Sequence, residues 1–281
     1  VVQGSDGRYY LYYFKGNSGI IGVAVCDTPA GKYTYYGHVR YPNGKRLGKN
    51  HEKDFWQFDP GVFRDDDGKI YLYTGFAPKS PNIFTRFCHV NGAMGVELCD
   101  DMLTVKPETM THIACSQHNS AGSGYEGHEF FEASSMRKFG GKYYFIYSSV
   151  NGHELCYAVG DKPLGKFTYG GTLVSIGDLG LSLQPTNYLG NTHGSVEYIN
   201  GKYYVFYHRQ TNRHCHSRQA CAEEIRLLPD GKFVQAEVTS CGLNGEPLVG
   251  KGRYEARIAC NLTSAKGVSF YTAKLPAGKH P

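Results

Sequence analysis

The sequence predicts an all-β fold, a β-propeller of which about four blades lie between residues 1 and 240. One observation is a hairpin motif that recurs four times, as DGRYYLYY at 6–13, DGKIYLY at 67–73, GGKYYFIY at 140–147 and NGKYYVFY at 200–207. Each copy is a turn dipeptide followed by an aromatic and β-branched run, the pattern of a hairpin entering a strand. A second observation is that no long segment shows the 3.6-residue periodicity of a helix.

The spacing of the copies gives the size of the repeating unit. The repeat glycines Gly7, Gly68, Gly141 and Gly201 are 61, 73 and 60 residues apart. A unit of about 60 residues with three or four short strands is typical of a propeller blade. A β-sandwich with similar hairpins remains the alternative.

A second motif follows the hairpin in two of the copies. VAVCDTPAGKY at 23–33 matches YAVGDKPLGKF at 157–167, and Asp27 precedes Asp161 by 134 residues, as Gly7 precedes Gly141. The two copies therefore keep one internal register, which is expected of blades.

Composition excludes several classes of protein. The 30 basic and 25 acidic residues are interleaved, so the net charge of +5 forms no stripe for nucleic acid. The longest apolar run, 20–25, is far shorter than the roughly 18 residues of a membrane span. The chain begins at Val1 without a recognisable leader, and we expect that something upstream has been removed.

Cysteines and the C-terminal residues add little. The nine cysteines are an odd number without a C-x-x-C pair, so most are expected to fill apolar positions, and a disulfide between Cys215 and Cys221 is left open. Residues 241–281, rich in glycine and turn dipeptides, are expected to be a short β-rich extension or the start of a further module.

Counting back from the repeat glycines reaches three ionisable residues. Asp59 lies nine residues before Gly68, Glu132 nine before Gly141, and His193 eight before Gly201. The innermost strand of each blade lines the central channel, so these side chains are expected to converge there. Because charged groups on apolar strands are costly without a partner or water, we interpret them as a polar pocket in which two carboxylates face a substrate.

Each assignment has an alternative. Asp59 would otherwise be a turn residue ahead of Pro60, Glu132 a salt-bridge partner at the rim, and His193 a core histidine. Glu126 and Glu129 compete with Glu132, and the register of the repeat favours Glu132.

These motifs resemble family 43 of the glycoside hydrolases, five-bladed propellers that cleave arabinose or xylose units from plant cell-wall polysaccharides. The similarity covers about residues 1–240. It implies that Asp59, in the Asp-Pro strand, tunes the pKa of the acid and orients it, and that Glu132 is the general acid. It also implies that His193, in a His-Gly-Ser strand, sits on the axis beside a water-ligated cation, often calcium, and that Arg209 is a sugar ligand.

The same resemblance implies an inverting mechanism, in which the acid and a base lie about 6.5 to 9.5 Å apart so that a water fits between substrate and base. Two departures from the family pattern stand out. Ala133-Ser134 replaces the usual Gly-Pro after the acid, and the aspartate base of the first blade has no counterpart, so the chain is expected to be a fragment lacking that blade. The base would then lie upstream of Val1.

Aromatic residues flank the carboxylate strands, and Trp56 and Phe131 are the expected platforms for sugar rings, with packing at a strand end as the alternative for Trp56. The sugar and the linkage would depend on the loops at 41–53 and 115–127. The partner is expected to be a plant polysaccharide or oligosaccharide, without an organic cofactor, nucleic acid or membrane, and the family resemblance implies secretion or a periplasmic location. A non-catalytic carbohydrate-binding propeller and a fructan-active five-bladed glycosidase are the alternatives.

Overall fold

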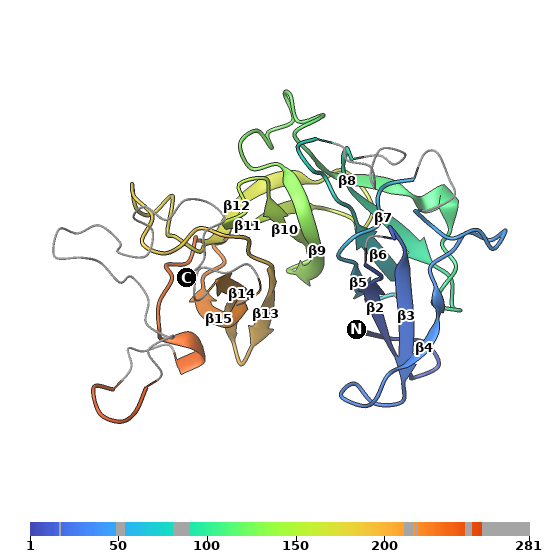
Figure 1. Ribbon diagram of the computed structural model, residues 1–281, viewed down its shortest axis with the longest axis horizontal. Helices are drawn as coiled ribbons and strands as arrows, with labels where there is room; N and C mark the ends of the chain where they lie inside the picture. Colours follow the sequence, from blue (N-terminus) through green and yellow to red (C-terminus); the bar gives the residue numbers. More distant parts are fainter. Residues whose placement is uncertain are drawn as a thin grey trace. The chain divides into compact units, whose positions relative to one another are not determined.

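A computed structural model describes residues 1–16, 18–48, 54–80, 90–210, 216, 218–244 and 249–254. They form two compact units, one with Val1–Val150 and Ala158–Tyr169, the other with Asn151–Tyr157 and the chain from Gly170 onward. The regular structure of these residues consists of β-strands and two short 3-10 helices (Figure 1).

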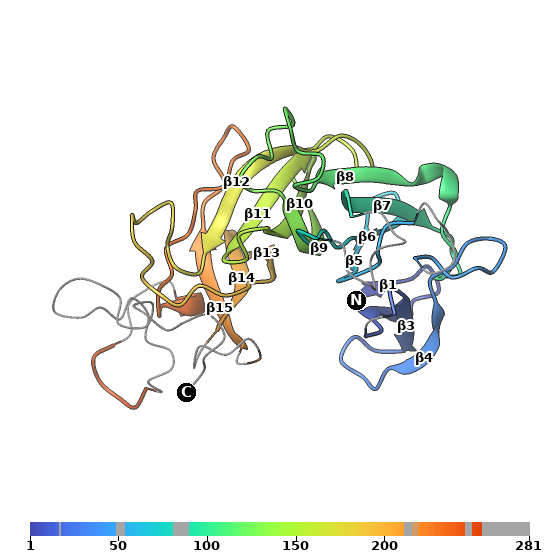
Figure 2. The same cartoon turned by 45° about the horizontal axis from the view of Figure 1, so that its top comes forward.

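The strands form four sheets whose strands follow one another in chain order, the arrangement of propeller blades. The first blade contains β1 (Val2–Gln3), β2 (Tyr9–Phe14), β3 (Ile21–Cys26) and β4 (Thr34–His38). The second contains β5 (Gly61–Arg64), β6 (Ile70–Thr74), β7 (Gly92–Leu98) and β8 (Thr111–Cys115), with the 3-10 helix η1 (Pro107–Thr109) before β8. Both lie in the first unit, where β5 contacts β1 (Figure 2).

The third blade contains β9 (Phe130–Phe139), β10 (Lys142–Ser149), β11 (Glu154–Gly160) and β12 (Thr168–Ser175). The fourth sheet contains β13 (Gly194–Ile199), β14 (Lys202–Gln210) and β15 (Arg218–Ile225). The predicted all-β propeller with about four blades is confirmed.

The four repeat glycines explain why the motif recurs. Gly7, Gly68, Gly141 and Gly201 have φ values of 82°, 85°, 78° and 83°, and a Cβ atom at any of them would meet no atom within 4 Å. The turns therefore need glycine for its left-handed backbone and not for space. Each turn joins the innermost strand of a blade to the next strand, as the repeat predicts.

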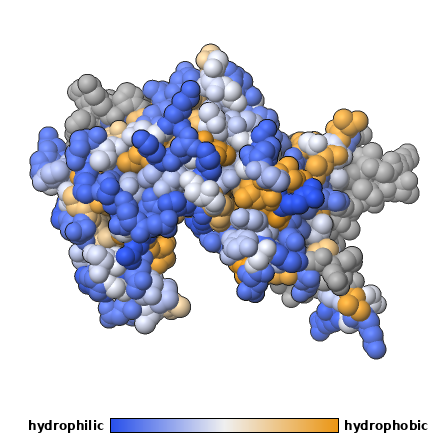
Figure 3. Space-filling view, turned by 180° about the vertical axis from the view of Figure 1, so that it is seen from behind, coloured by the Kyte–Doolittle hydropathy of each residue, from blue (hydrophilic) through white to orange (hydrophobic). Residues whose placement is uncertain are grey.

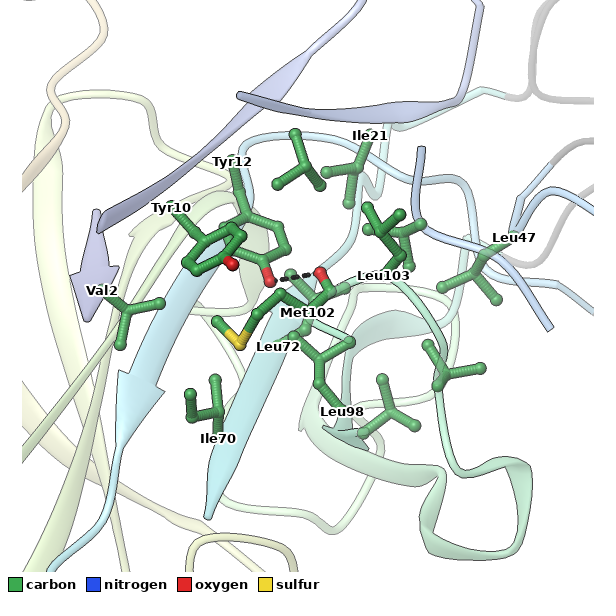
Figure 4. Close-up of a cluster of buried hydrophobic side chains, with 14 of the residues drawn as sticks. Val2, Tyr10, Tyr12, Ile21, Leu47, Ile70, Leu72, Leu98, Met102 and Leu103 are labelled. Carbon is green, nitrogen blue, oxygen red and sulfur yellow. Dashed lines mark hydrogen bonds between the residues drawn. The ribbon is translucent and has the colours of Figure 1, made fainter. Parts of the chain in front are cut away.

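Apolar side chains of the first two blades form a continuous core (Figure 4). Alternate residues of the strands supply it, because successive side chains of a strand point to opposite faces. The hydroxyl of Tyr12 in β2 is buried there and donates a hydrogen bond to the carbonyl oxygen of Met102 at 2.6 Å. The face of the molecule in Figure 3 is, by contrast, largely hydrophilic.

In the second unit the chain after β15 returns to β12. The amide of Ala236 donates to the carbonyl of Leu173 at 2.8 Å, and the amide of Val238 donates to the buried carboxylate of Asp178 at 2.8 Å. Glu223 accepts hydrogen bonds from the amide and the hydroxyl of Thr239 at 2.8 and 2.7 Å. Two buried carboxylates thus hold residues 236–239 against the last strands.

Of the expected C-terminal extension, the structure describes residues 241–244 and 249–254, and its regular structure there is the 3-10 helix η3 (Gly242–Asn244). Residues 245–248 and 255–281 lie outside the described residues, as does Cys215, so the extension and the disulfide stay predictions. Among the cysteines of the described segments, Cys156 is buried but Cys26, Cys99, Cys115, Cys221 and Cys241 are half-buried, so the expectation that most of them fill buried positions is wrong for these residues. None of the helices in the described segments has the length and apolar character to cross a bilayer.

Candidate active site

Asp59 and Glu132 meet in the first unit, at the inner edge of the second and third blades. A carboxylate oxygen of Asp59 lies within 4.8 Å of one of Glu132. Glu132 is 7% exposed and Asp59 is half-buried. Two residues 73 positions apart in the sequence therefore form a close, largely buried acidic pair.

Asp59 is held in place by the strands around it. It directly precedes Pro60 and β5, with φ at 43°, a left-handed conformation that is uncommon for residues other than glycine. Next to it, the amide of Phe58 donates to the hydroxyl of Thr74 in β6 at 2.9 Å, and that hydroxyl donates back to the carbonyl of Phe58 at 2.8 Å. Asp59 therefore lies at a turn ahead of Pro60, as the alternative interpretation predicted. Its side chain nevertheless faces Glu132.

Glu132 lies in β9 at an irregularity of the ladder. It pairs with Ser148 of β10, the pairing register shifts on the Ile146 side of that pair, and Ala133 has φ at 65°. An extra residue in one strand of a ladder re-aims the neighbouring side chain, and such bulges are frequent near active sites. The sequence departure at Ala133 therefore coincides with a left-handed residue, which glycine would occupy at lower cost.

The competing carboxylates have other partners. Glu126 accepts hydrogen bonds from the amides of Gly122 and Ser123 within an exposed loop, and these bonds, with one from its own amide, lower the pKa of its carboxyl. Glu129 accepts a hydrogen bond from the hydroxyl of Ser120 at 3.1 Å. Glu126 thus stays ionised within its loop, which does not suit a proton donor.

A row of four half-buried phenylalanines passes both carboxylates. Ring centroids are 4.4 Å apart for Phe14 and Phe58, 4.9 Å for Phe58 and Phe76, and 5.2 Å for Phe76 and Phe131. Phe58 immediately precedes Asp59 and Phe131 immediately precedes Glu132. The row includes the predicted Phe131, whereas the other three were not predicted, although the repeated Phe-carboxylate pair was a usable signal for Phe58.

Trp56 is buried in the first unit. Its side chain is 6% exposed, and a Cβ atom on Gly19 would lie 2.9 Å from its ring, so the backbone at Gly19 packs against the indole. These contacts fit the alternative of packing at a strand end, and the role of Trp56 as a sugar platform stays a prediction.

His193 and Arg209 lie in the second unit. His193 directly precedes β13, and its ring centroid is 5.4 Å from that of His208 in β14. Burial lowers the pKa of His208 to about 4, helped by the positive charges of His193 and Arg218. Both ring nitrogens of His208 are shielded from solvent and find no hydrogen-bond partner among the described residues.

Arg209 follows His208 on β14 and is 7% exposed. Burial raises the pKa of the Cys221 thiol on β15, and the Arg209 guanidinium opposes that rise. Arg209 thus lies buried beside the Cys221 thiol, and its role as a sugar ligand stays a prediction.

The chain resembles known proteins along most of its length. The profile of "Glycosyl hydrolases family 43" matches residues 2–233. A xylosidase/arabinosidase of Thermoclostridium stercorarium is 52% identical over 93% of this chain and 54% of its own, and xylosidase/arabinosidase 43A of Humicola insolens is 34% identical over 82% and 71%. The chain thus spans about half the length of the first relative.

Solved structures give the same result. A GH43 β-xylosidase/α-arabinofuranosidase from a compost microbial metagenome, in complex with xylotriose and in a calcium-free form, superposes with a TM-score of 0.62 at 29% identity, covering 83% of this chain and 71% of that one. An α-L-arabinofuranosidase from Clostridium thermocellum superposes with a TM-score of 0.59 at 30% identity over 83% and 70%. With four blades, a matching profile and these relatives, the chain belongs to glycosyl hydrolases family 43.

Proposed function

We propose that this chain forms the main part of a glycoside hydrolase that releases xylosyl or arabinofuranosyl units from plant cell-wall polysaccharides with inversion. The observation that carries the proposal is the acidic pair, Asp59 and Glu132, within 4.8 Å of each other. The relatives named xylosidase/arabinosidase support the substrate class.

Glu132 is the proposed general acid, which protonates the leaving-group oxygen as the glycosidic bond breaks. Asp59 is the proposed modulator. Its position within 4.8 Å of Glu132, at a residue fixed by the surrounding strands, would orient the acid. The binding of Glu126 by its own loop supports this choice of acid.

Asp59 is too close to Glu132 to be the base of an inverting pair. Such a pair is separated by about 6.5 to 9.5 Å, whereas these carboxylates approach within 4.8 Å. With inversion, as proposed, a third carboxylate is needed to deprotonate the attacking water, and the family resemblance assigns this role to an aspartate on a further blade.

The phenylalanine row supplies the proposed sugar platform, with Phe131 and Phe58 next to the carboxylates. Aromatic faces pack against the apolar faces of sugar rings while the hydroxyl groups bind polar side chains. Arg209 is a proposed ligand for a sugar hydroxyl. Because Arg209 takes no part in the proposed proton transfer, its substitution should weaken substrate binding more than it slows the proton transfer.

A calcium ion beside His193 is also proposed. Both ring nitrogens of His208, next to His193, are buried without a hydrogen-bond partner among the described residues, and ordered water around an ion would supply one. When bound, the ion would add positive charge that attracts sugar oxygens. His193 would hold one of the ion's water ligands.

We further propose that residues 1–240 are the catalytic propeller, that 241–281 belong to an extension, and that the protein is secreted or periplasmic. A polysaccharide substrate outside the cell supports that location. The names of the relatives support hydrolysis over a non-catalytic binding propeller and over a fructan-active enzyme.

The test is hydrolysis by the full-length protein of nitrophenyl β-xyloside, nitrophenyl α-arabinofuranoside and a fructan. We expect turnover of at least one pentoside, with the product anomer inverted by proton NMR, and no turnover of fructan. Glu132→Gln should lose at least about 100-fold in kcat, within the range for general acid catalysis. Glu126→Gln, the matched control, should stay near wild type; binding of arabinoxylan without turnover would contradict the proposal.

A further inference from the structure

Gly61, the first residue of β5, lies against the backbone of β9, the inner strand of the next blade. A Cβ atom at Gly61 would lie 2.4 Å from the carbonyl oxygen of Ser134, 2.9 Å from its carbonyl carbon and 3.2 Å from the Cα of Ser135. All three are backbone atoms of β9. No side-chain rotation can therefore relieve the clash, and β5 and β9 would have to move apart.

Gly61 is required because the backbone of β9 leaves no room for a side chain, and not because its backbone is left-handed. The left-handed glycines of the described segments include Gly68 in the next turn but not Gly61. An alanine at position 61 would keep an ordinary backbone conformation. The effect of the substitution is thus confined to the contact between the strands.

This contact is next to the acidic pair. Gly61 lies two residues after Asp59, and Ser134 lies two residues after Glu132. On one side of it, the amide of Ala77, just after β6, donates to the carbonyl of Phe131 at 2.9 Å. The contact between β5 and β9 at Gly61 thus lies within two residues of each carboxylate along the chain.

Beyond Gly61, at the far end of β5, Lys138 of β9 bonds to the carboxylate of Asp65 at 2.7 Å. β9 is therefore held to the second blade at two places, by the residue that follows β5 and by a residue just after β6. A new side chain at Gly61 would act against these attachments, so the strands would separate locally, close to Asp59 and Glu132.

We propose that Gly61 is a positioning residue of the reaction: its missing side chain lets β5 and β9 meet and so sets the separation of Asp59 and Glu132. The inference rests on the proposed roles of these two carboxylates. An ordinary contact of a Cβ atom is 3.4 Å or longer, whereas the Cβ atom of an alanine at position 61 would lie 2.4 Å from the carbonyl oxygen of Ser134, so alanine would part the strands by about 1 Å. A misplacement of that size can cost about 100-fold in rate.

The test compares Gly61→Ala with Gly37→Ala in the full-length protein. At Gly37 in β4 a Cβ atom would lie 2.7 Å from Cδ1 of Leu103, so the control crowds a blade away from the carboxylates. Kinetics are measured on pentosides with a poor and a good leaving group, and thermal unfolding is followed for both variants.

We expect Gly61→Ala to lose about 10- to 100-fold in kcat with the poor leaving group and less than about 5-fold with the good one, with KM within about 3-fold. Gly37→Ala should lose stability without this split. Equal losses for both leaving groups, or kinetics like those of Gly37→Ala, would overturn the inference.

If Gly61→Ala does not fold alone, it is placed in an Ala133→Gly background, where β9 is relieved of its left-handed alanine, and compared with that single variant. Glu132→Gln distinguishes a failure of the positioning role of Gly61 from a failure of the proposed function. If it shows the leaving-group split and Gly61→Ala does not, the positioning role fails while the proposed function stands; if neither shows it, the proposed function fails.

Discussion

Asp65 joins the two catalytic strands at their far end, and its charge should matter to stability. Its carboxylate accepts hydrogen bonds from Nζ of Lys138 at 2.7 Å, from the hydroxyl of Tyr143 at 2.6 Å and from the amide of Asp66 at 2.8 Å. The side chain is 8% exposed. Asp65→Asn keeps the shape, removes the charge and weakens the bonds from Lys138 and Tyr143.

The expected loss is about 2 to 3 kcal/mol in the free energy of unfolding, because a hydrogen bond to a charged group contributes about 1.5 to 3 kcal/mol. At about 2 to 4 °C per kcal/mol, this loss lowers Tm by about 5 to 10 °C. Asp66→Asn is the matched control, since Asp66 bonds to the same Nζ at 2.8 Å but is 86% exposed. The control should lose no more than about 0.5 kcal/mol.

The pH dependence gives an independent check. Burial opposes ionisation of Asp65, but the bonds from Lys138 and Tyr143 outweigh it and lower the pKa of its carboxyl. A lowered pKa means that the stabilisation is complete above the unfolded value near 4 and is lost as the pH falls through the folded pKa. Urea unfolding at pH 7 and at pH 3 should show the difference between wild type and Asp65→Asn shrinking; equal losses in Asp65→Asn and Asp66→Asn would refute the reasoning.

Three further substitutions probe other parts of the structure. Ala133→Gly should stabilise the protein by about 0.5 kcal/mol, seen as a higher urea midpoint. A left-handed L-residue costs about 1 to 2 kcal/mol, and the greater backbone entropy of glycine in the unfolded chain cancels part of the gain. A lower midpoint would contradict this prediction. Glu223→Ala should cost about 2 to 4 kcal/mol in thermal unfolding, since it leaves the amide and hydroxyl of Thr239 without their acceptor, and a loss below 1 kcal/mol would count against that account. Because the pKa of His208 is lowered to about 4, stability should fall between pH 6.5 and pH 4, and His208→Phe should flatten this slope in a urea series; an unchanged slope would exclude His208 as its cause.

The blade pattern was readable from the sequence because local requirements set it. Each of the four repeat turns needs a left-handed glycine, so the motif marks each hairpin, and counting back from Gly68 and Gly141 reaches Asp59 and Glu132. Because the inner strand and its turn have the same length in these blades, a count of nine residues back from the glycine locates the carboxylate without information about tertiary contacts. This is why the acidic pair was found.

Contacts between segments that are far apart in the chain could not be predicted from the sequence. The burial of Trp56 depends on Gly19, which lies on another strand connection, and the phenylalanine row joins residues from three parts of the chain. The hydrogen bond from Thr239 to Glu223 likewise forms only because the chain after β15 returns to the sheet. A side chain's type gave no indication of which of these it would meet.

The leaving-group dependence of Glu132→Gln tests the central claim most directly, with pentosides whose leaving groups range from methanol to 2,4-dinitrophenol. If Glu132 donates the proton, the loss in kcat/KM should exceed about 100-fold for the poorest leaving group and fall below about 10-fold for dinitrophenol, which departs without protonation. A loss that is the same across the series would contradict the assignment of Glu132 as the acid.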